Sequence, residues 1–504
     1  MKGKVYLVGA GPSDPGLFTI KGREVLSRAE VVVYDALVGP SILQMIPENA
    51  EAINVGKRSS NHIMKQEDIN ELLAAKAKEG KTVVRLKGGD PFLFGRGGEE
   101  LEILVRDGID FEVVPGIPSA ISVPAYQGIP VTHRDYCSSL HIITGHKKAG
   151  KEYDIDFEAL VRTKGTLVFL MGVAALGDIC SSLIAAGMDP DTPAALLSRG
   201  TQACQRRIVA TVGSLKEEVD KAGAITPAII VVGEVCSLAE DFAWYEKQPL
   251  GGVKVLLTRP KELISETARE LRSRGADVVE FPAIKTVKIE NNEELYKAME
   301  SVNQFGWIVF TSPTGVRIFF KDLAEKQIDC RKLGNIKIAA IGGGTKKELA
   351  ARGYYADLMP EIADGDHLGM ALAEECRKTP GVKVLIPRAR IGNKELTEHL
   401  QAAGAEIFDI PTYDTVYARG EIVDEKKLVE DGEIDYCLFT SASTVKGFAE
   451  AIGQTDYSKI KAICIGKQTE EQAAKLGMQT WTAAKPSIKE LIAKLEEVHG
   501  GINS

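Results

Sequence analysis

Short apolar runs that end in glycine-rich turns alternate with segments of helical spacing along the chain. The first run, Lys4–Val8, ends at Gly9, and residues 19–29 then show helical spacing with Thr19 at the N-cap position. The next run, Val31–Val33, is followed by Tyr34 and Asp35. Apolar runs of about four to eight residues that alternate with helical segments predict β-strands that alternate with α-helices. We therefore expect an α/β protein.

The same pattern continues to about residue 245. It predicts a helix over Gln66–Glu79, closed by Gly80, and strands at Ile53–Val55, Val83–Leu86, Phe111–Val114, His141–Thr144, Thr166–Met171, Ala194–Leu197 and Ala228–Val232. The carboxyl ends of parallel strands share one edge of a sheet, and ligands bind at that edge. Residues that directly follow these strands are therefore the first candidates for a site.

Five glycines and one arginine lie within eleven residues, from Gly88 to Gly98, directly after one predicted strand. Paired glycines allow positive φ angles and let a ligand approach the backbone closely. Asp90 supplies an acceptor, and Pro91 fixes the exit of the turn. A plain strand-to-helix turn is the alternative, but such a connection does not need this composition. The stretch predicts a small-molecule site.

The turn after the first strand is similar to a dinucleotide-binding loop but departs from it at decisive positions. The third glycine of the G-x-G-x-x-G pattern would fall at Asp14, and Pro12 and Pro15 stop a helix from starting within the turn. The sequence thus disfavours a Rossmann nucleotide site.

Composition narrows the class of protein. Of 504 residues, 44% are hydrophobic and 26% are charged, which is ordinary for a globular enzyme. The net charge of -8 is spread over both halves, so we expect no nucleic-acid partner. No apolar stretch reaches the roughly 18 residues of a membrane span, and we expect a soluble, cytoplasmic protein. The eight cysteines form no Cys-x-x-Cys pair and the histidines form no cluster, so we expect core thiols and no metal site.

An internal repeat begins after residues 246–252, which have the composition of a short linker. VKVLLTRP at 253–260 recurs as VKVLIPRA at 382–389, an offset of 129, and WIVFTSPTGV at 307–316 recurs as YCLFTSASTV at 436–445. The period is too long for a solenoid. It predicts two homologous α/β lobes, each a parallel sheet with helices on both faces, with the cleft between them as the default site. We assign one lobe to about 253–283 plus 417–500 and the other to 287–411.

Seven motifs in residues 1–245 carry a resemblance: GAGPSDPGLFTIKG, VVVYD, VGKR, RLKGGDPFLFGRGGEE, VVPGIPSAISVPAYQGIPVTHR, LVFLMG and SRGTQ. Together they resemble the tetrapyrrole methylase family, and most of all its uroporphyrinogen III C-methyltransferase branch. The resemblance implies two α/β lobes with S-adenosylmethionine in the cleft between them, and usually a homodimer. It implies donor contacts at Pro12, Gly88, Gly89, Asp90, Leu93, Pro118, Ser119, Met171 and Gly200. The branch usually has threonine and alanine where Pro118 and Ser119 stand, which leaves backbone contacts there.

The same resemblance assigns Asp35 as proton acceptor and Lys57 as proton donor. In this chemistry an electron-rich pyrrole carbon attacks the sulfonium methyl group, and the positive charge that develops on the macrocycle favours a nearby carboxylate. The family's substrate carries eight carboxylates, so basic side chains are the expected clamps. We assign this role to Lys57, Arg58, Arg96 and Arg134, with a solvated surface charge as the alternative for each.

The repeat half, about residues 253–495, carries paired FTS turns, paired IG-x-x-T turns and PTYDTV at 411–416. These motifs resemble uroporphyrinogen III synthase, which implies closure of hydroxymethylbilane with inversion of ring D and loss of water, without a cofactor. Tyr413 matches the family's interlobe tyrosine and is our candidate general acid, with packing of the interlobe hinge as its alternative. Arg259 and Arg388 occupy equivalent turns and favour anion binding. Hydroxyl and N–H groups at helix starts suit carboxylates, and we expect such contacts at Thr311, Ser312, Thr345, Thr440, Ser441, Ser443 and Thr469.

The sequence therefore predicts a bifunctional enzyme. It would cyclise hydroxymethylbilane to uroporphyrinogen III and methylate that product at C2 and C7 to precorrin-2, on the route to sirohaem and cobalamin. One alternative is a methylase of another precorrin or of a substrate that is not a tetrapyrrole. Another makes the repeat half a two-lobed binding module without turnover.

Overall fold

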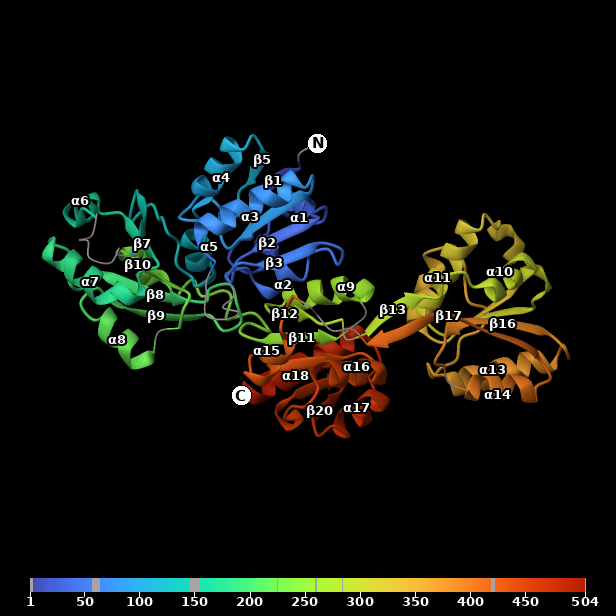
Figure 1. Ribbon diagram of the computed structural model, residues 1–504. Coiled ribbons are helices and arrows are strands. Elements are labelled where there is room, and N and C mark those ends of the chain that lie inside the picture. The colour runs from blue at the N-terminus through green and yellow to red at the C-terminus, as the bar shows by residue number, and fades with distance from the viewer. Residues whose placement is uncertain are drawn as a thin grey trace. The chain divides into compact units, whose positions relative to one another are not determined.

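The computed structural model describes residues 3–56, 64–145, 155–223, 225–258, 261–282, 284–392, 394–417 and 422–503. The chain forms two compact units (Figure 1). Unit 1 comprises Met1–Pro282 and Arg419–Ser504, and unit 2 comprises Ala283–Ala418. Four five-stranded sheets organise the described residues, three of them in unit 1 and one in unit 2. The α/β alternation predicted from the sequence is confirmed.

The first sheet of unit 1 is entirely parallel, in the order β3-β2-β4-β1-β5. Its strands are β1 (Lys4–Gly9), β2 (Val31–Tyr34), β3 (Glu51–Asn54), β4 (Thr82–Lys87) and β5 (Asp110–Val114). The helices of this region are α1 (Ile20–Leu26), α2 (Pro40–Leu43), α3 (Gln66–Lys78) and α4 (Gly97–Arg106). Thr19 caps α1 as predicted, because its Oγ1 accepts a hydrogen bond from the N–H of Gly22 at 3.0 Å.

The second sheet of unit 1 has the order β6-β7-β10-β8-β9. Only the β6–β7 pair is parallel; the three remaining pairs are antiparallel. The strands are β6 (Leu140–Thr144), β7 (Thr166–Leu170), β8 (Pro193–Ser198), β9 (Arg206–Thr211) and β10 (Ala228–Val232), and the helices are α5 (Ser119–Tyr126), α6 (Phe157–Thr163), α7 (Leu176–Ala185) and α8 (Leu215–Ala222). The sequence pattern does not predict β9, because this edge strand is only partly buried and begins with two arginines.

The third sheet of unit 1 is entirely parallel, in the order β12-β11-β18-β19-β20. It is built from β11 (Lys254–Thr258), β12 (Asp277–Glu280), β18 (Tyr436–Phe439), β19 (Lys461–Cys464) and β20 (Gln479–Thr482). Its helices are α9 (Lys261–Arg272), α15 (Glu425–Glu430), α16 (Ala442–Ile452), α17 (Lys467–Ala474) and α18 (Ile488–Asn503).

The sheet of unit 2 has the order β13-β17-β16-β14-β15. It contains β13 (Ile284–Lys288), β14 (Trp307–Phe310), β15 (Lys337–Ala340), β16 (Lys383–Ala389) and β17 (Glu406–Tyr417), with helices α10 (Glu293–Glu300), α11 (Pro313–Glu325), α12 (Gly343–Ala350), α13 (Gly365–Arg377) and α14 (Glu395–Ala402). The prediction of a purely parallel sheet is wrong here, since β13 runs antiparallel to β17. The chain enters the unit along β13 and leaves it along the neighbouring β17, so the two strands must run in opposite directions.

The internal repeat is visible in the strand orders of the last two sheets. The repeated sequences place β11 and β12 in correspondence with β16 and β17, and β18 and β19 in correspondence with β14 and β15. The order β12-β11-β18-β19 then matches β17-β16-β14-β15. The prediction that the two halves of the repeat share one topology is confirmed.

Within unit 1, the first sheet's region and the third sheet's region share hydrogen bonds. Ser41 Oγ donates to the carbonyl of Val278 at 2.8 Å, and the Gln44 side-chain amide bonds both the N–H and the carbonyl of Glu280. Glu280 lies on β12, the edge strand of the third sheet. Val423 lies buried in the same apolar cluster as α1 and α2. The two regions of unit 1 are therefore packed against each other through both polar and apolar contacts.

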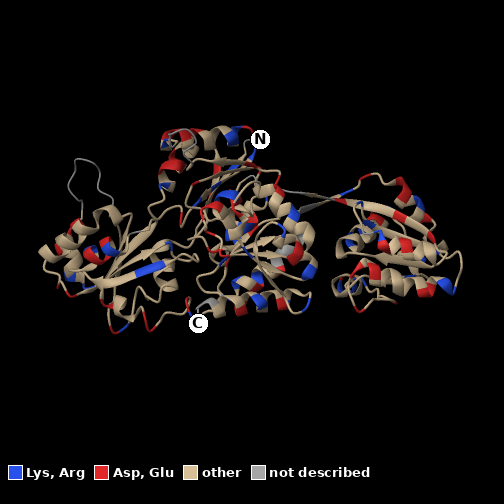
Figure 2. Ribbon diagram, turned by 90° about the horizontal axis from the view of Figure 1, so that it is seen from below, with Lys and Arg blue, Asp and Glu red and all other residues tan. Residues whose placement is uncertain are grey.

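Basic and acidic residues are interspersed along the helices of both units (Figure 2). In the part of the chain that the structure describes, no helix combines the length and the apolar character needed to cross a bilayer.

All eight cysteines carry free thiols, and five of them are buried. The expectation of core thiols is wrong for Cys204 and Cys330, which are exposed: Cys204 lies in a turn and Cys330 begins the short 3-10 helix Cys330–Leu333, both outside the sheets.

Two candidate active sites

The first candidate site lies at the carboxyl edge of the first sheet, where the turns after β1, β4 and β5 meet. Gly11 and Gly89 exchange backbone hydrogen bonds of 3.1 and 2.8 Å. Gly89 has a φ of +69°, and a Cβ on Gly9 would stand 2.5 Å from the Cα of Gly116. A side chain on Gly9 would overlap the turn after β5, and the positive φ of Gly89 favours glycine, so these residues let three turns approach one another.

Asp90 joins two of these turns. Its Oδ1 accepts hydrogen bonds from the N–H groups of Phe92 and Leu93 at 2.8 and 3.0 Å, and its Oδ2 accepts one from Gly116 at 3.0 Å. Because both carboxylate oxygens are occupied by backbone donors, Asp90 fixes the glycine turn relative to the turn after β5. Its observed contacts shape the site predicted for the methyl donor.

The other predicted donor contacts come from the regions of the first and the second sheet of unit 1. Thr201 Oγ1 donates to the Pro12 carbonyl at 3.1 Å, next to Gly200. A Cβ on Gly200 would stand 2.4 Å from Cγ1 of Val123 on α5, so only glycine fits there. Leu93 packs against the same apolar cluster as Val123. These contacts join the turn of Pro12 to the turn of Gly200 and Thr201, and the latter to α5.

The backbone conformation is notable at three further predicted donor contacts, Pro118, Ser119 and Met171. Pro118 precedes α5 with φ of -72° and ψ of 146°, and Ser119 is the first residue of the helix. Met171 directly follows β7 with a φ of +55°, and its side chain is 55% exposed. Exposure of an apolar side chain in a left-handed conformation costs free energy and is more common at ligand sites than elsewhere.

Asp35 follows β2 at the same sheet edge, with a side chain that is 25% exposed. Its Oδ1 accepts a hydrogen bond from the N–H of Leu37 at 3.1 Å, and its Oδ2 lies 3.6 Å from Nη2 of Arg85. Arg85 and Lys87 are buried on β4 and both contact Glu100 of α4. Burial lowers the pKa of Lys87, and the neighbouring Arg85 lowers it further.

The sequence interpretation missed Arg85, Lys87 and Glu100 as site residues. A signal was present, because two basic residues at positions i and i+2 of an apolar strand share one face of the sheet. Their partner could not be identified in that way, since Glu100 lies on a helix fifteen residues from Arg85.

The predicted substrate clamps differ in what surrounds them. Arg96 is exposed and donates through Nε and Nη2 to Glu99, with a shortest contact of 2.5 Å, and this carboxylate raises the pKa of the guanidinium. Arg134 is exposed as well. Lys57, Arg58 and Arg259 lie outside the described residues.

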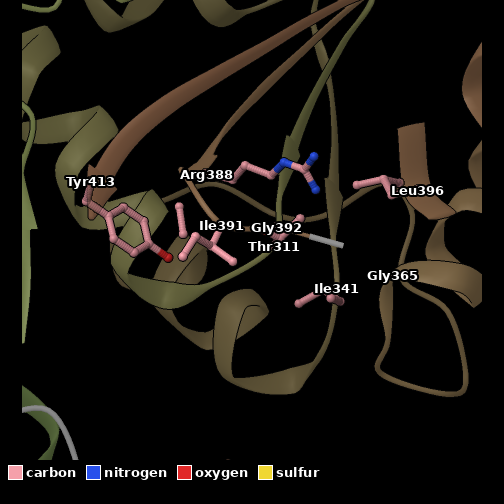
Figure 3. Close-up of a pocket in the computed structure, with 9 residues that line it drawn as sticks. Thr311, Ile341, Gly365, Arg388, Ile391, Gly392, Leu396 and Tyr413 are labelled. Carbon is pink, nitrogen blue, oxygen red and sulfur yellow. The ribbon is translucent and has the colours of Figure 1, made fainter. Parts of the chain in front are cut away.

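The second candidate site is a cavity of about 260 Å³ in unit 2 (Figure 3). It lies where β14, β15 and β16 end, the edge at which parallel sheets bind ligands. Of the predicted residues, Thr311, Arg388 and Tyr413 line it. The cavity is completed by Ile341, Gly365, Ala389, Ile391, Gly392 and Leu396.

Tyr413 is 6% exposed, and its hydroxyl oxygen lies 2.7 Å from Oγ of Ser312. Ser312 caps α11, because its Oγ also accepts a hydrogen bond from the N–H of Gly315 at 3.0 Å. Burial raises the pKa of the Tyr413 phenol, and the Ser312 hydrogen bond and nearby Arg317 offset part of that increase. The phenol therefore keeps its proton at neutral pH and can act as a donor.

Arg388 is buried and is held by two charge-assisted hydrogen bonds to Asp409. Its Nε and Nη2 donate to the two carboxylate oxygens at 2.7 and 2.6 Å. A Cβ on Gly392 would stand 2.6 Å from Nη1, so a side chain at position 392 would collide with the guanidinium. The planar pairing fixes the orientation of Arg388 at the cavity wall.

The remaining predicted contacts of this half divide between the units. Thr345 in unit 2 and Thr469 in unit 1 are both buried, 2% and 4% exposed, in the first turns of α12 and α17. In unit 1, Thr440 follows β18, and Ser441 caps α16 with its Oγ 2.8 Å from Oγ of Ser443. Each unit thus contains its own set of polar residues at strand ends. Among the described residues, no group of three or more potential metal-binding side chains occurs.

Comparison with known proteins identifies both parts of the chain. Residues 4–216 match the family model of "Tetrapyrrole (Corrin/Porphyrin) Methylases", and residues 265–493 match that of "Uroporphyrinogen-III synthase HemD". The "Porphyrin biosynthesis protein HemD" of Ruminiclostridium josui is 48% identical over 499 residues, which cover 99% of each chain. The "S-adenosyl-L-methionine-dependent uroporphyrinogen III methyltransferase" of Methanosarcina barkeri is 54% identical over 237 residues, 47% of this chain and 93% of the relative.

A solved structure also matches the first half. The "Uroporphyrin-III C-methyl transferase from Thermus thermophilus complexed with S-adenyl homocysteine" is 40% identical, with a TM-score of 0.41, and covers 47% of this chain and 99% of its own. The two family models and the relative aligned over 99% of the chain confirm the resemblances found in the sequence for both halves. The chain belongs to the family in which a tetrapyrrole methylase is fused to a uroporphyrinogen-III synthase.

Proposed function

We propose that the chain carries two consecutive activities of tetrapyrrole biosynthesis. Residues 253–500 cyclise hydroxymethylbilane to uroporphyrinogen III, and residues 1–245 methylate that product at C2 and C7 to give precorrin-2. Residues 246–252 link the two parts. The observation that carries the proposal is that one chain matches both family models. A relative named for porphyrin biosynthesis aligns with it over 99% of both chains.

The residues of the first site fit S-adenosylmethionine as methyl donor. Gly88 and Gly89 are partly exposed and present backbone groups without side chains, and Met171 is 55% exposed. The bound donor supplies an electrophilic methyl group on a sulfonium. The protein's part is to hold the pyrrole carbon in line with that group, because orientation is the main requirement of such a displacement.

In the proposed methylation, the macrocycle gains positive charge as its carbon forms the new bond to the methyl group. Asp35 is the carboxylate that stabilises this charge and accepts the proton that the macrocycle loses. Lys57 is the proposed proton donor, and Arg58, Arg96 and Arg134 are the proposed partners of the substrate's carboxylates. Arg96 would have to exchange its contact with Glu99 for a substrate carboxylate.

In the proposed cyclisation, Tyr413 donates its proton to the departing hydroxyl of the bilane, which leaves as water. Ser312 holds the phenol by a hydrogen bond of 2.7 Å. The strand-end hydroxyls of both repeats, with Arg259 and Arg388, hold the substrate's carboxylates. We propose that this half needs no cofactor, that the protein is a homodimer through its methylase half, and that it acts in the cytoplasm on small-molecule substrates.

Product analysis tests the proposal directly. The purified protein is given hydroxymethylbilane with and without S-adenosylmethionine, and early products are separated by chromatography. Uroporphyrinogen III without the donor, and a dimethylated product with it, support both activities. An excess of uroporphyrinogen I, which forms without enzyme, would overturn the synthase assignment and favour a binding module. Failure to methylate supplied uroporphyrinogen III would overturn the methylase assignment.

A further inference from the structure

Three charged side chains are buried together behind the first candidate site. Arg85 and Lys87 on β4 are 3% and 4% exposed, and Glu100 on α4 is fully buried. Oε1 of Glu100 accepts hydrogen bonds from Lys87 Nζ at 2.7 Å, Arg85 Nε at 3.1 Å and Gln66 Nε2 at 3.2 Å. Oε2 of Glu100 is buried and has no hydrogen-bond partner among the described residues.

Burial of this cluster of charges costs free energy that apolar side chains in the same place would not cost. Well-packed apolar residues stabilise a fold as well as buried ion pairs do, or better, because charges lose their hydration on burial. A buried carboxylate oxygen without a partner adds a further cost, because its lost hydration is not replaced by a hydrogen bond. Stability alone does not account for the cluster. One of its members, Arg85, also lies near Asp35 at the carboxyl edge of the first sheet, which points to a second role.

Arg85 connects the cluster to Asp35. On the neighbouring strand β2, Val33 is the register partner of Arg85, and Asp35 stands two residues further toward the carboxyl edge. Nη1 of Arg85 donates to the carbonyls of Val33 and Leu86 at 3.3 and 3.2 Å, while Nε donates to Glu100. These contacts lock the guanidinium plane and direct Nη2 to Oδ2 of Asp35, at 3.6 Å.

We propose that Arg85 is a positioning residue for Asp35 in the methylation reaction, and that Glu100, which also accepts a hydrogen bond from Lys87, holds Arg85 in place. The proposal rests on the proposed role of Asp35 as proton acceptor. One oxygen of this carboxylate accepts a hydrogen bond from the N–H of Leu37, the other lies 3.6 Å from the guanidinium, and the side chain remains a quarter exposed.

A double-mutant cycle tests this coupling in the full-length protein, with methylation of uroporphyrinogen III as the rate. Asp35→Asn, Arg85→Gln and the double variant are compared with the wild type. We expect Arg85→Gln to lower kcat by about 10- to 100-fold with little change in KM, and to cost nothing further when Asp35 is already asparagine. Additive losses in the double variant would overturn the proposal, because they would mean that Arg85 acts without Asp35.

Two further variants separate positioning from folding. Arg85→Lys keeps the charge without the second arm of the guanidinium, and we expect partial recovery of kcat. Arg106→Gln is the matched control: this arginine lies on α4 and pairs with Asp107 at 2.7 Å on the surface, so its loss should leave the rate unchanged. Equal losses in Arg85→Gln and Arg106→Gln would contradict the assignment.

A crystal structure of Arg85→Lys gives a readout that does not depend on turnover, and it remains informative if Arg85→Gln does not fold. We expect Oδ2 of Asp35 to leave its wild-type position. An unmoved carboxylate would overturn the positioning role even if the enzyme methylates as proposed. Conversely, full activity of Asp35→Asn would overturn the role of Asp35 itself, and a displaced carboxylate would still support its coupling to Arg85.

Discussion

The two candidate sites hold their reacting oxygens in opposite ways. Asp35 is partly exposed, and a buried cluster of full charges stands behind it. Tyr413 is almost fully buried, and its nearest polar partner is the neutral hydroxyl of Ser312. A proton acceptor beside a developing cation must stay ionised, whereas a proton donor to a leaving hydroxyl must stay neutral. At the second site, burial favours the neutral phenol that the proposed reaction needs.

The sharpest way to test this contrast is to remove the charge at the first site alone. Asp35→Asn should lower the methylation rate by about 100-fold or more, since general acid–base groups contribute about 10²- to 10⁴-fold. Cyclisation of hydroxymethylbilane by the same variant should remain at the wild-type rate. Both rates are measured on one preparation by product chromatography. Parallel loss of both activities would mean that the two sites are not independent.

The converse change removes the proton donor at the second site. Tyr413→Phe deletes one hydroxyl and keeps the buried ring, so we expect cyclisation to fall by about 100-fold, near the lower limit for general acid catalysis. Methylation of supplied uroporphyrinogen III serves as the internal control and should not change. A variant that cyclises at the wild-type rate would leave Tyr413 with the packing role alone.

A smaller effect is expected from the partner of Tyr413. Ser312→Ala removes the helix cap and the hydrogen bond to the phenol, and we expect cyclisation to fall by about 2- to 10-fold, the equivalent of one neutral hydrogen bond. The lost cap should also lower the free energy of unfolding by about 1 kcal/mol.

Asp424→Ala is the matched control for that cap. Asp424 is exposed and caps α15 through a 3.1 Å hydrogen bond from the N–H of Lys427. Its loss should cost a similar free energy of unfolding, measured by urea denaturation, without changing the cyclisation rate. If both variants slow cyclisation equally, stability rather than the Ser312–Tyr413 contact explains the effect.

The smallest expected effect is on the pH dependence of stability. Burial raises the pKa of Tyr413 above its usual value of 10.0, so the folded protein holds this proton more tightly than the unfolded chain does. The resulting stabilisation is fully present below pH 10 and is lost as pH rises through the raised pKa. Urea unfolding should therefore show wild type losing stability faster than Tyr413→Phe above pH 10. Parallel curves would contradict the inferred environment of the phenol.

Local patterns were sufficient for much of the fold. Apolar runs predicted the strands of the first sheet to within one or two residues, and Thr19 and Gly80 marked helix ends that the structure confirms. The pattern failed at β9, whose side chains are half exposed, and at β13, whose antiparallel direction depends on how the chain enters unit 2. Both failures concern strands at the edges of sheets, where burial imposes little periodicity.

The sequence by itself determined which residues end strands, which cap helices and which turns require glycine, because these properties depend on neighbours a few residues apart. It also determined the repeat, in which Ser312 and Ser441 cap corresponding helices. Only the tertiary structure decided that Arg85 faces Asp35, fifty residues away, and that Ser312 meets Tyr413, 101 residues away. Such pairs depend on which strands become neighbours and in what register, and this is fixed by packing of the whole sheet rather than by local spacing.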